Sequence, residues 1–182
     1  MTRTKSTYLA LLAVLLSPMA ANADLIGSNV TANYYYSDLG SLIGTANSIV
    51  TDPGIEFFGT FPGDSIQFDS IDLTADSINF FFLPDACCQW TSGVPYNGFV
   101  FEFDPGVLSN LIGATFAPNT DGYVDSMISW VGDSLYINWQ GGGITGVESV
   151  HVNLAFVPEP GTLALLGIGL LGMAASRRRK KV

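Results

Sequence analysis

Residues 149–156 read SVHVNLAF and carry the clearest strand pattern of the chain. Apolar side chains at Val150, Val152, Leu154 and Phe156 alternate with polar ones. Because successive side chains of a strand point to opposite faces of a sheet, this stretch predicts a half-buried β-strand. The fold is therefore expected to contain a sheet with one face on a core, and His151 is expected on the outer face.

The same alternation recurs along the chain between short turn signals. Phe99, Phe101 and Phe103 share one face of another predicted strand, and Gly132-Asp133 has the pattern of a two-residue hairpin turn. Asp-Pro-Gly turns at 52–54 and 104–106 separate further apolar runs. We also expect strands within residues 30–36, 55–58, 66–73, 78–82, 128–130 and 135–139, with a bulge near 69–70.

Many short strands between Gly, Pro and Asp turns predict an all-β fold, a single antiparallel β-sandwich or jelly-roll-like domain over residues 24–156. Only residues 107–112 are expected to make one helical turn. The length suffices for one domain with a core and is too short for two.

An N-terminal signal helix is expected before this domain. Arg3 and Lys5 form a positive start, residues 8–16 are apolar, and Ala21-Asn22-Ala23 has the small-x-small pattern of a cleavage site. We therefore expect signal peptidase to remove residues 1–23 from an exported protein.

The tail, residues 157–182, has three parts in order. Val157, Pro158, Glu159, Pro160 and Gly161 break the preceding segment, since neither proline has a backbone N–H to donate. Residues 161–175 are uncharged and predict a short transmembrane helix. Five cations follow, which favours a cytoplasmic end at the inner membrane with the domain in the periplasm: Arg177, Arg178, Arg179, Lys180 and Lys181.

This order of parts resembles the PEP-CTERM sorting signal of exported proteins from Gram-negative bacteria that make exopolysaccharide. The resemblance implies that an exosortase-like membrane protease recognises the motif at 157–161 and removes the helix. The protein would then pass to the cell surface or extracellular matrix. An ordinary anchor that is never cut is the alternative. The same tail is also catalogued under an ice-binding protein label, but the threonines of the domain are scattered and form no regular array.

Charge is distributed unevenly along the chain. All seven Lys and Arg residues lie at the two ends, whereas of 16 Asp and Glu residues only Glu159 lies outside residues 24–156. Carboxylates of the domain must therefore face water, accept backbone N–H bonds or meet an added cation. Nucleic acid is excluded as a partner, because the domain has no cations to neutralise phosphates.

Calcium is the only cofactor that the sequence suggests. Asn119, Asp121 and Asp125 resemble a fragment of a calcium loop around Gly122. The fragment lacks the alternating third ligand and the terminal Glu of an EF-hand, and a plain Asn/Asp/Gly turn is the other interpretation.

Cys87 and Cys88 are adjacent in a chain expected in an oxidising compartment. A vicinal disulfide would be strained, because neighbouring Cα atoms lie only about 3.8 Å apart. Bonds to another chain and free or modified thiols are the alternatives.

The sequence predicts no catalytic residue. A Ser-His-Asp system would have to use His151, the only histidine, and no nucleophile elbow is present. Trp90, Tyr96, Trp130 and Trp139 have rings that can stack on sugars, although alternation directs Trp130 and Trp139 to the core.

These observations favour a non-enzymatic, acidic structural or adhesive protein of an exopolysaccharide matrix or biofilm. The alternatives are a carbohydrate-binding module that uses exposed aromatic side chains, including Trp90, and then a polysaccharide hydrolase.

Overall fold

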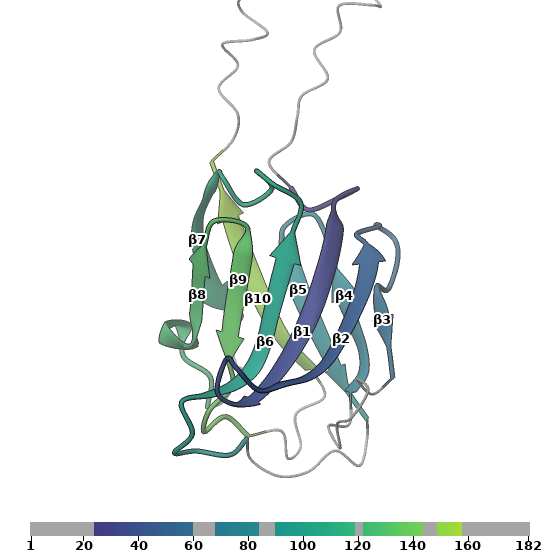
Figure 1. The fold of residues 1–182 in the computed structure, drawn as a ribbon. Helices are drawn as coiled ribbons and strands as arrows, with labels where there is room; N and C mark the ends of the chain where they lie inside the picture. The colour runs from purple at the N-terminus through teal and green to yellow at the C-terminus, as the bar shows by residue number, and fades with distance from the viewer. Residues whose placement is uncertain (1–23, 60–67, 84–89, 119–121, 144–148, 158–182) are drawn as a thin grey trace, which may run out of the picture. The chain divides into compact units, whose positions relative to one another are not determined.

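Two antiparallel five-stranded sheets pack against each other (Figure 1). The computed structural model describes residues 24–59, 68–83, 90–118, 122–143 and 149–157, which lie in one unit of the chain. Its strands are β1 (Asn29–Ser37), β2 (Leu42–Ile49), β3 (Phe57–Phe58), β4 (Phe68–Leu73), β5 (Ser77–Phe82), β6 (Tyr96–Phe103), β7 (Leu111–Phe116), β8 (Ile128–Val131), β9 (Ser134–Asn138) and β10 (Ser149–Phe156). The prediction of an all-β fold with antiparallel sheets is confirmed.

Sheet A has the strand order β2-β1-β6-β9-β8, and sheet B has the order β3-β4-β5-β10-β7. Figure 1 looks onto sheet A, with β5 and β10 of sheet B behind it. The pairs β6·β9 and β5·β10 lie in opposite sheets and are nested in the sequence. Nested strand pairs that lie in opposite sheets are typical of jelly rolls.

Aromatic side chains from both sheets fill the core. Phe99 and Phe101 of β6 lie 5.7 and 5.9 Å, between ring centroids, from Phe80 of β5. Trp139 meets Phe80 edge-on at 4.7 Å. Each such pair contributes about 0.5–1.5 kcal/mol beyond the apolar area that it buries, so these rings hold the two sheets together.

The pattern at 149–156 is confirmed as strand β10. Val150 and Val152 are fully buried and Leu154 is nearly so, whereas Phe156 at the strand end is only partly covered. The strand pairs with β5 on one side and β7 on the other. A central position in sheet B explains why its inner face is the most regular apolar pattern of the chain.

A predicted hairpin turn and a predicted bulge are also confirmed. Gly132-Asp133 joins β8 to β9, and Gly132 has φ +58°, the conformation that a primed hairpin turn requires. The register of β4 against β5 shifts between Phe68 and Ser70, at the predicted bulge.

One strand was missed, and two local predictions were wrong. Strand β2 was missed, because its LIGTANSI sequence consists largely of small or polar residues. The helical turn expected at 107–112 is a set of turns before β7, which begins at Leu111. Strand β3 is shorter than 55–58, because the carboxylate of Glu56 instead accepts the N–H groups of Thr51 (2.8 Å) and Leu73 (2.7 Å).

Among the residues that the structure describes, no helix is long and apolar enough to cross a membrane. The predicted signal helix at 1–23 and the predicted transmembrane helix at 161–175 lie outside those residues.

Candidate functional site

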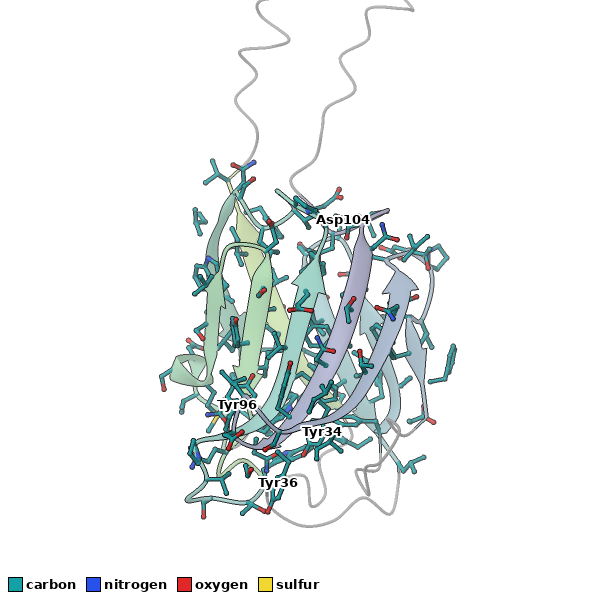
Figure 2. All side chains as sticks on the ribbon, in the orientation of Figure 1. Tyr34, Tyr36, Tyr96 and Asp104 are labelled. Carbon is teal, nitrogen blue, oxygen red and sulfur yellow. The ribbon has the colours of Figure 1, made fainter. Side chains whose placement is uncertain are left out.

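The outer face of sheet A gathers tyrosine and polar side chains, and we call this set the tyrosine face: Asn33, Tyr35, Tyr96, Glu102 and Tyr136. They come from β1, β6 and β9, the three central strands of sheet A. The register places Asn33 opposite Val100, and Val100 opposite Tyr136. Tyr96 lies at the lower end of β6 in Figure 2.

Direct contacts organise the tyrosine face. Asn33 Nδ2 donates to Glu102 Oε2 at 3.0 Å, and Tyr35 meets Tyr96 edge-on with centroids 6.4 Å apart. The Tyr96 hydroxyl donates to the carbonyl of Phe99 at 2.7 Å. Gly98 lies between these two residues in the sequence, and a Cβ there would overlap the carbonyl oxygen of Ile137. Glycine is therefore required at this position of β6.

Two hydroxyls of this face, those of Tyr35 and Tyr96, stay protonated at neutral pH because their pKa values are raised. Burial raises the pKa of Tyr96 above its ordinary value. Burial also raises the pKa of Tyr35, and the Glu102 and Tyr136 side chains nearby add to the effect. Tyr35 and Tyr96 thus present neutral phenols near the bonded side chains of Asn33 and Glu102. Tyrosine rings with convergent polar groups can stack on a sugar and bond to its hydroxyls.

The prediction that Trp90 is exposed for sugar stacking is wrong. Only 6% of Trp90 is exposed, and its ring stacks on Trp139 at 5.6 Å. Its Nε1 donates to the hydroxyl of Tyr123 at 2.9 Å, and burial raises the pKa of Tyr123 to about 12. Tyr96 is also mostly buried, so its ring contributes to the tyrosine face chiefly by packing.

Trp130 and Trp139 point toward the core, as alternation predicted. Trp139 is fully buried, and Trp130 is partly buried against the same core. Within the described part of the chain, Trp139 Nε1 is the one buried side-chain polar atom without a hydrogen-bond partner.

His151 lies on the outer face of sheet B, as predicted, in a line of polar side chains. Its Nδ1 lies 2.7 Å from Asn79 Oδ1 and its Nε2 lies 2.9 Å from Ser149 Oγ. Asn79 Nδ2 reaches Asp72 Oδ2 at 3.5 Å, which orients the amide because a carboxylate only accepts. The Asn79 carbonyl then requires a proton on Nδ1, so that in the neutral imidazole Nε2 accepts from Ser149.

In this contact the Ser149 hydroxyl is hydrogen-bonded to the His151 ring, the arrangement of a serine activated by a general base. Ser149, however, is the first residue of strand β10 and does not occupy a nucleophile elbow. Sequence reasoning placed His151 on this face but had no signal for Asn79, which β5 brings opposite it.

Backbone N–H groups, in place of cations, satisfy many carboxylates of the domain. Asp104 Oδ2 accepts from both the backbone N–H and the side-chain amide of Asn29, each at 2.8 Å. Asp133 accepts from the N–H groups of Gly106 (2.9 Å) and Leu108 (3.0 Å). The expectation that carboxylates without Lys or Arg partners use backbone donors is confirmed at these positions.

The candidate calcium fragment is only partly described. Asp125 opens the short 3₁₀ helix η1 (Asp125–Met127), and its Oδ1 accepts the N–H of Phe116 at 2.9 Å. Asn119 and Asp121 lie outside the described residues. Among those that are described, no group of three or more His, Cys, Asp or Glu side chains could hold a metal ion.

The remaining predicted sites lie mostly outside the described residues, namely Cys87 and Cys88, residues 158–161 of the sorting motif, and the basic cluster at 177–181. Val157 is described, and its N–H donates to the carbonyl of Asn110 at 2.9 Å. Strand β10 ends at Phe156, and the predicted sorting motif begins at the next residue, Val157.

Comparison with known proteins identifies the tail. Residues 156–180 match the PEP-CTERM protein-sorting motif, which confirms the resemblance. Such a motif indicates an exported protein that a membrane protease, an exosortase, processes at the membrane. No curated protein and no solved structure matches the chain.

Proposed function

We propose that this protein is a structural or adhesive component of an exopolysaccharide matrix or biofilm. The sorting motif at residues 156–180 is the observation that supports this role most directly. In this proposal signal peptidase removes residues 1–23, and the tail then holds the protein in the inner membrane with its domain in the periplasm. Exosortase processing delivers the domain to the cell surface or matrix.

The chemistry of the domain supports a role without catalysis. Its charge is wholly acidic apart from His151, so it can be bridged to other acidic polymers through divalent cations. We propose Ca²⁺ as the bridging ion, bound by surface carboxylates such as Asp125 together with Asn119 and Asp121.

The intact mass of the protein from its native host tests this proposal. We expect loss of residues 1–23 and of the tail beyond the Pro158–Pro160 region, with added mass if the new end is attached to another molecule. A mass that retains residues 161–182 would contradict matrix delivery and would indicate a permanently anchored protein facing the periplasm.

The tyrosine face favours a second candidate function, the binding of a polysaccharide. Tyr136 and Tyr35 lie beside the bonded Asn33–Glu102 pair on an uninterrupted sheet face. We expect Tyr136→Ala to weaken binding to the host's exopolysaccharide about tenfold, as loss of one stacked ring would. Phe58→Ala is the matched control, because Phe58 is 73% exposed on the opposite sheet. Equal affinities in a binding isotherm would exclude the tyrosine face as the binding site.

A further inference from the structure

Strand β2 is the long open edge of the sandwich. The four edge strands of the two sheets are β2, β8, β3 and β7. Strand β3 has two residues and β8 has four, which leaves little edge to pair with. Strand β7 contacts β8 at the other side of the sandwich. Strand β2 has eight residues and, in the described part of the chain, pairs only with β1 (Figure 1).

The hydrogen-bonding groups on the open side of β2 can be assigned from its pairing. The N–H of Val50 donates to the carbonyl of Ser28 at 2.9 Å, so the backbone of Val50 points toward the β1 side. In an antiparallel pair this direction alternates along the strand. The backbone N–H and C=O groups of Thr45, Asn47 and Ile49 therefore point away from β1, toward solvent.

Residues 44–49 of β2 have no charge, proline or bulge to protect the edge, and no strand among the described residues pairs with their open side. Edge strands are normally guarded by Lys or other charges, by proline, by a covering segment or by a bulge. Residues 42–49 contain no charge and no proline, and the chain has no Lys or Arg between residues 24 and 157. A register shift occurs only at the Tyr34/Tyr35 end, so Gly44–Ile49 stays regular.

The distribution of carboxylates favours β2 as the contact between two copies of the chain. The domain is acidic throughout, so most of its surface repels a second copy. No carboxylate occurs between Asp38 and Asp52, and this interval contains all of β2. Two β2 strands can approach without placing acidic side chains of the strands opposite each other.

We propose that β2 pairs antiparallel with β2 of a second copy of this chain and joins the two A sheets into one. The register that uses all three outward-pointing residues places Asn47 opposite Asn47 at the two-fold axis and Thr45 opposite Ile49. This register avoids the irregular end at Ile43. Self-association of this kind goes beyond sorting, because it does not depend on how the tail is processed.

Cysteine cross-linking in the native host tests the register with the full chain. A hydrogen-bonded antiparallel pair has Cα atoms about 5.5 Å apart, within the range of a disulfide. We expect Asn47→Cys to give a disulfide-linked dimer on a non-reducing gel, above the background of the wild-type chain with its Cys87 and Cys88. Asn153→Cys, exposed on the interior strand β10 of sheet B, is the control. No increase for Asn47→Cys, or an equal increase for both variants, would overturn the proposal.

Sedimentation of the exported protein provides a second test without a new cysteine. We expect wild-type protein to dimerise more strongly as salt screens the acidic domains. Asn47→Glu places two like charges opposite each other and should weaken the dimer at least about tenfold, whereas Asn153→Glu adds the same charge elsewhere and should not. Wild-type protein that stays monomeric at low and at high salt would show that β2 is not the interface. Equal dimerisation of Asn47→Glu and Asn153→Glu would show the same.

Discussion

Individual carboxylates in this domain are stabilised by amide groups. Asp104 bonds to the backbone and side chain of Asn29 and thereby ties the end of β6 to the start of β1 (Figure 2). These bonds, first the backbone N–H of Asn29 and then its side-chain amide, hold the pKa of Asp104 below its ordinary value. A lowered pKa means that the folded state favours the charged form.

Replacement of Asp104 should therefore have a pH-dependent effect. We expect Asp104→Asn to lower the melting temperature at pH 7. The difference from wild type should shrink as the pH falls through the lowered pKa, because the wild-type carboxylate is then protonated too. Asp76→Asn removes an equal charge from an exposed turn and is the control. A difference between Asp104→Asn and wild type that is the same at pH 7 and at about pH 3 would contradict this assignment.

Asp72 shows the opposite behaviour. Burial raises its pKa, with Glu56 and Asp52 adding to the rise and the bond from Asn79 opposing it. Ionisation of Asp72 thus works against folding as the pH rises, whereas ionisation of Asp104 supports folding. The two residues differ because burial and the Glu56 carboxylate dominate at Asp72, whereas the two short bonds from Asn29 dominate at Asp104.

At the scale of elements, turns are joined through side chains. The β8–β9 hairpin places Asp133 against the turn after β6, where its carboxylate accepts the N–H groups of Gly106 and Leu108. Its carbonyl also accepts the N–H of Phe103. One residue of a two-residue turn therefore connects β6, β8 and β9.

We expect Asp133→Ala to lower the free energy of unfolding by about 1–3 kcal/mol, the usual effect of losing hydrogen bonds to a charged group. Chemical denaturation at pH 7 measures this loss. Asp76→Ala should have little effect, because Asp76 lies exposed in the turn between β4 and β5. Equal stabilities of the two variants would mean that the hairpin does not depend on the Asp133 carboxylate.

For the whole molecule, the main electrostatic feature is the separation of cations and carboxylates along the chain. All Lys and Arg residues lie at the two ends, so the domain itself carries no internal Lys or Arg ion pair. Repulsion among its carboxylates extends over about 30 Å at 0.01 M salt and about 10 Å at 0.1 M. Screening therefore favours the compact state.

We accordingly expect the melting temperature of the exported protein to rise as sodium chloride increases from about 0.01 to 0.5 M. Millimolar Ca²⁺ should raise it further at equal ionic strength if surface carboxylates share the ion. Mg²⁺ at the same concentration is the control for charge alone. A melting temperature indifferent to both salt and Ca²⁺ would contradict the role assigned to carboxylate repulsion.

Local sequence patterns predicted the sandwich because each strand with a buried face has alternating large side chains. Strands β5, β6 and β10 have this pattern, whereas β2 has small residues and is stabilised chiefly by its pairing with β1. Trp90 was misplaced for a related reason. It lies outside the strands, where alternation says nothing, and only its stacking on Trp139 and its bond to Tyr123 show that it is buried.

The fold class, the acidic character of the domain and the sorting motif of the tail could be predicted from the sequence, because they depend on composition and on residues near one another in the chain. The strand order, the tyrosine face, the Asn79–His151 contact and the open edge of β2 became visible in the folded domain alone. These features join segments tens of residues apart, and their geometry depends on which strands pair across the sheets. Backbone pairing and aromatic packing between the sheets select that arrangement, and no local pattern records it.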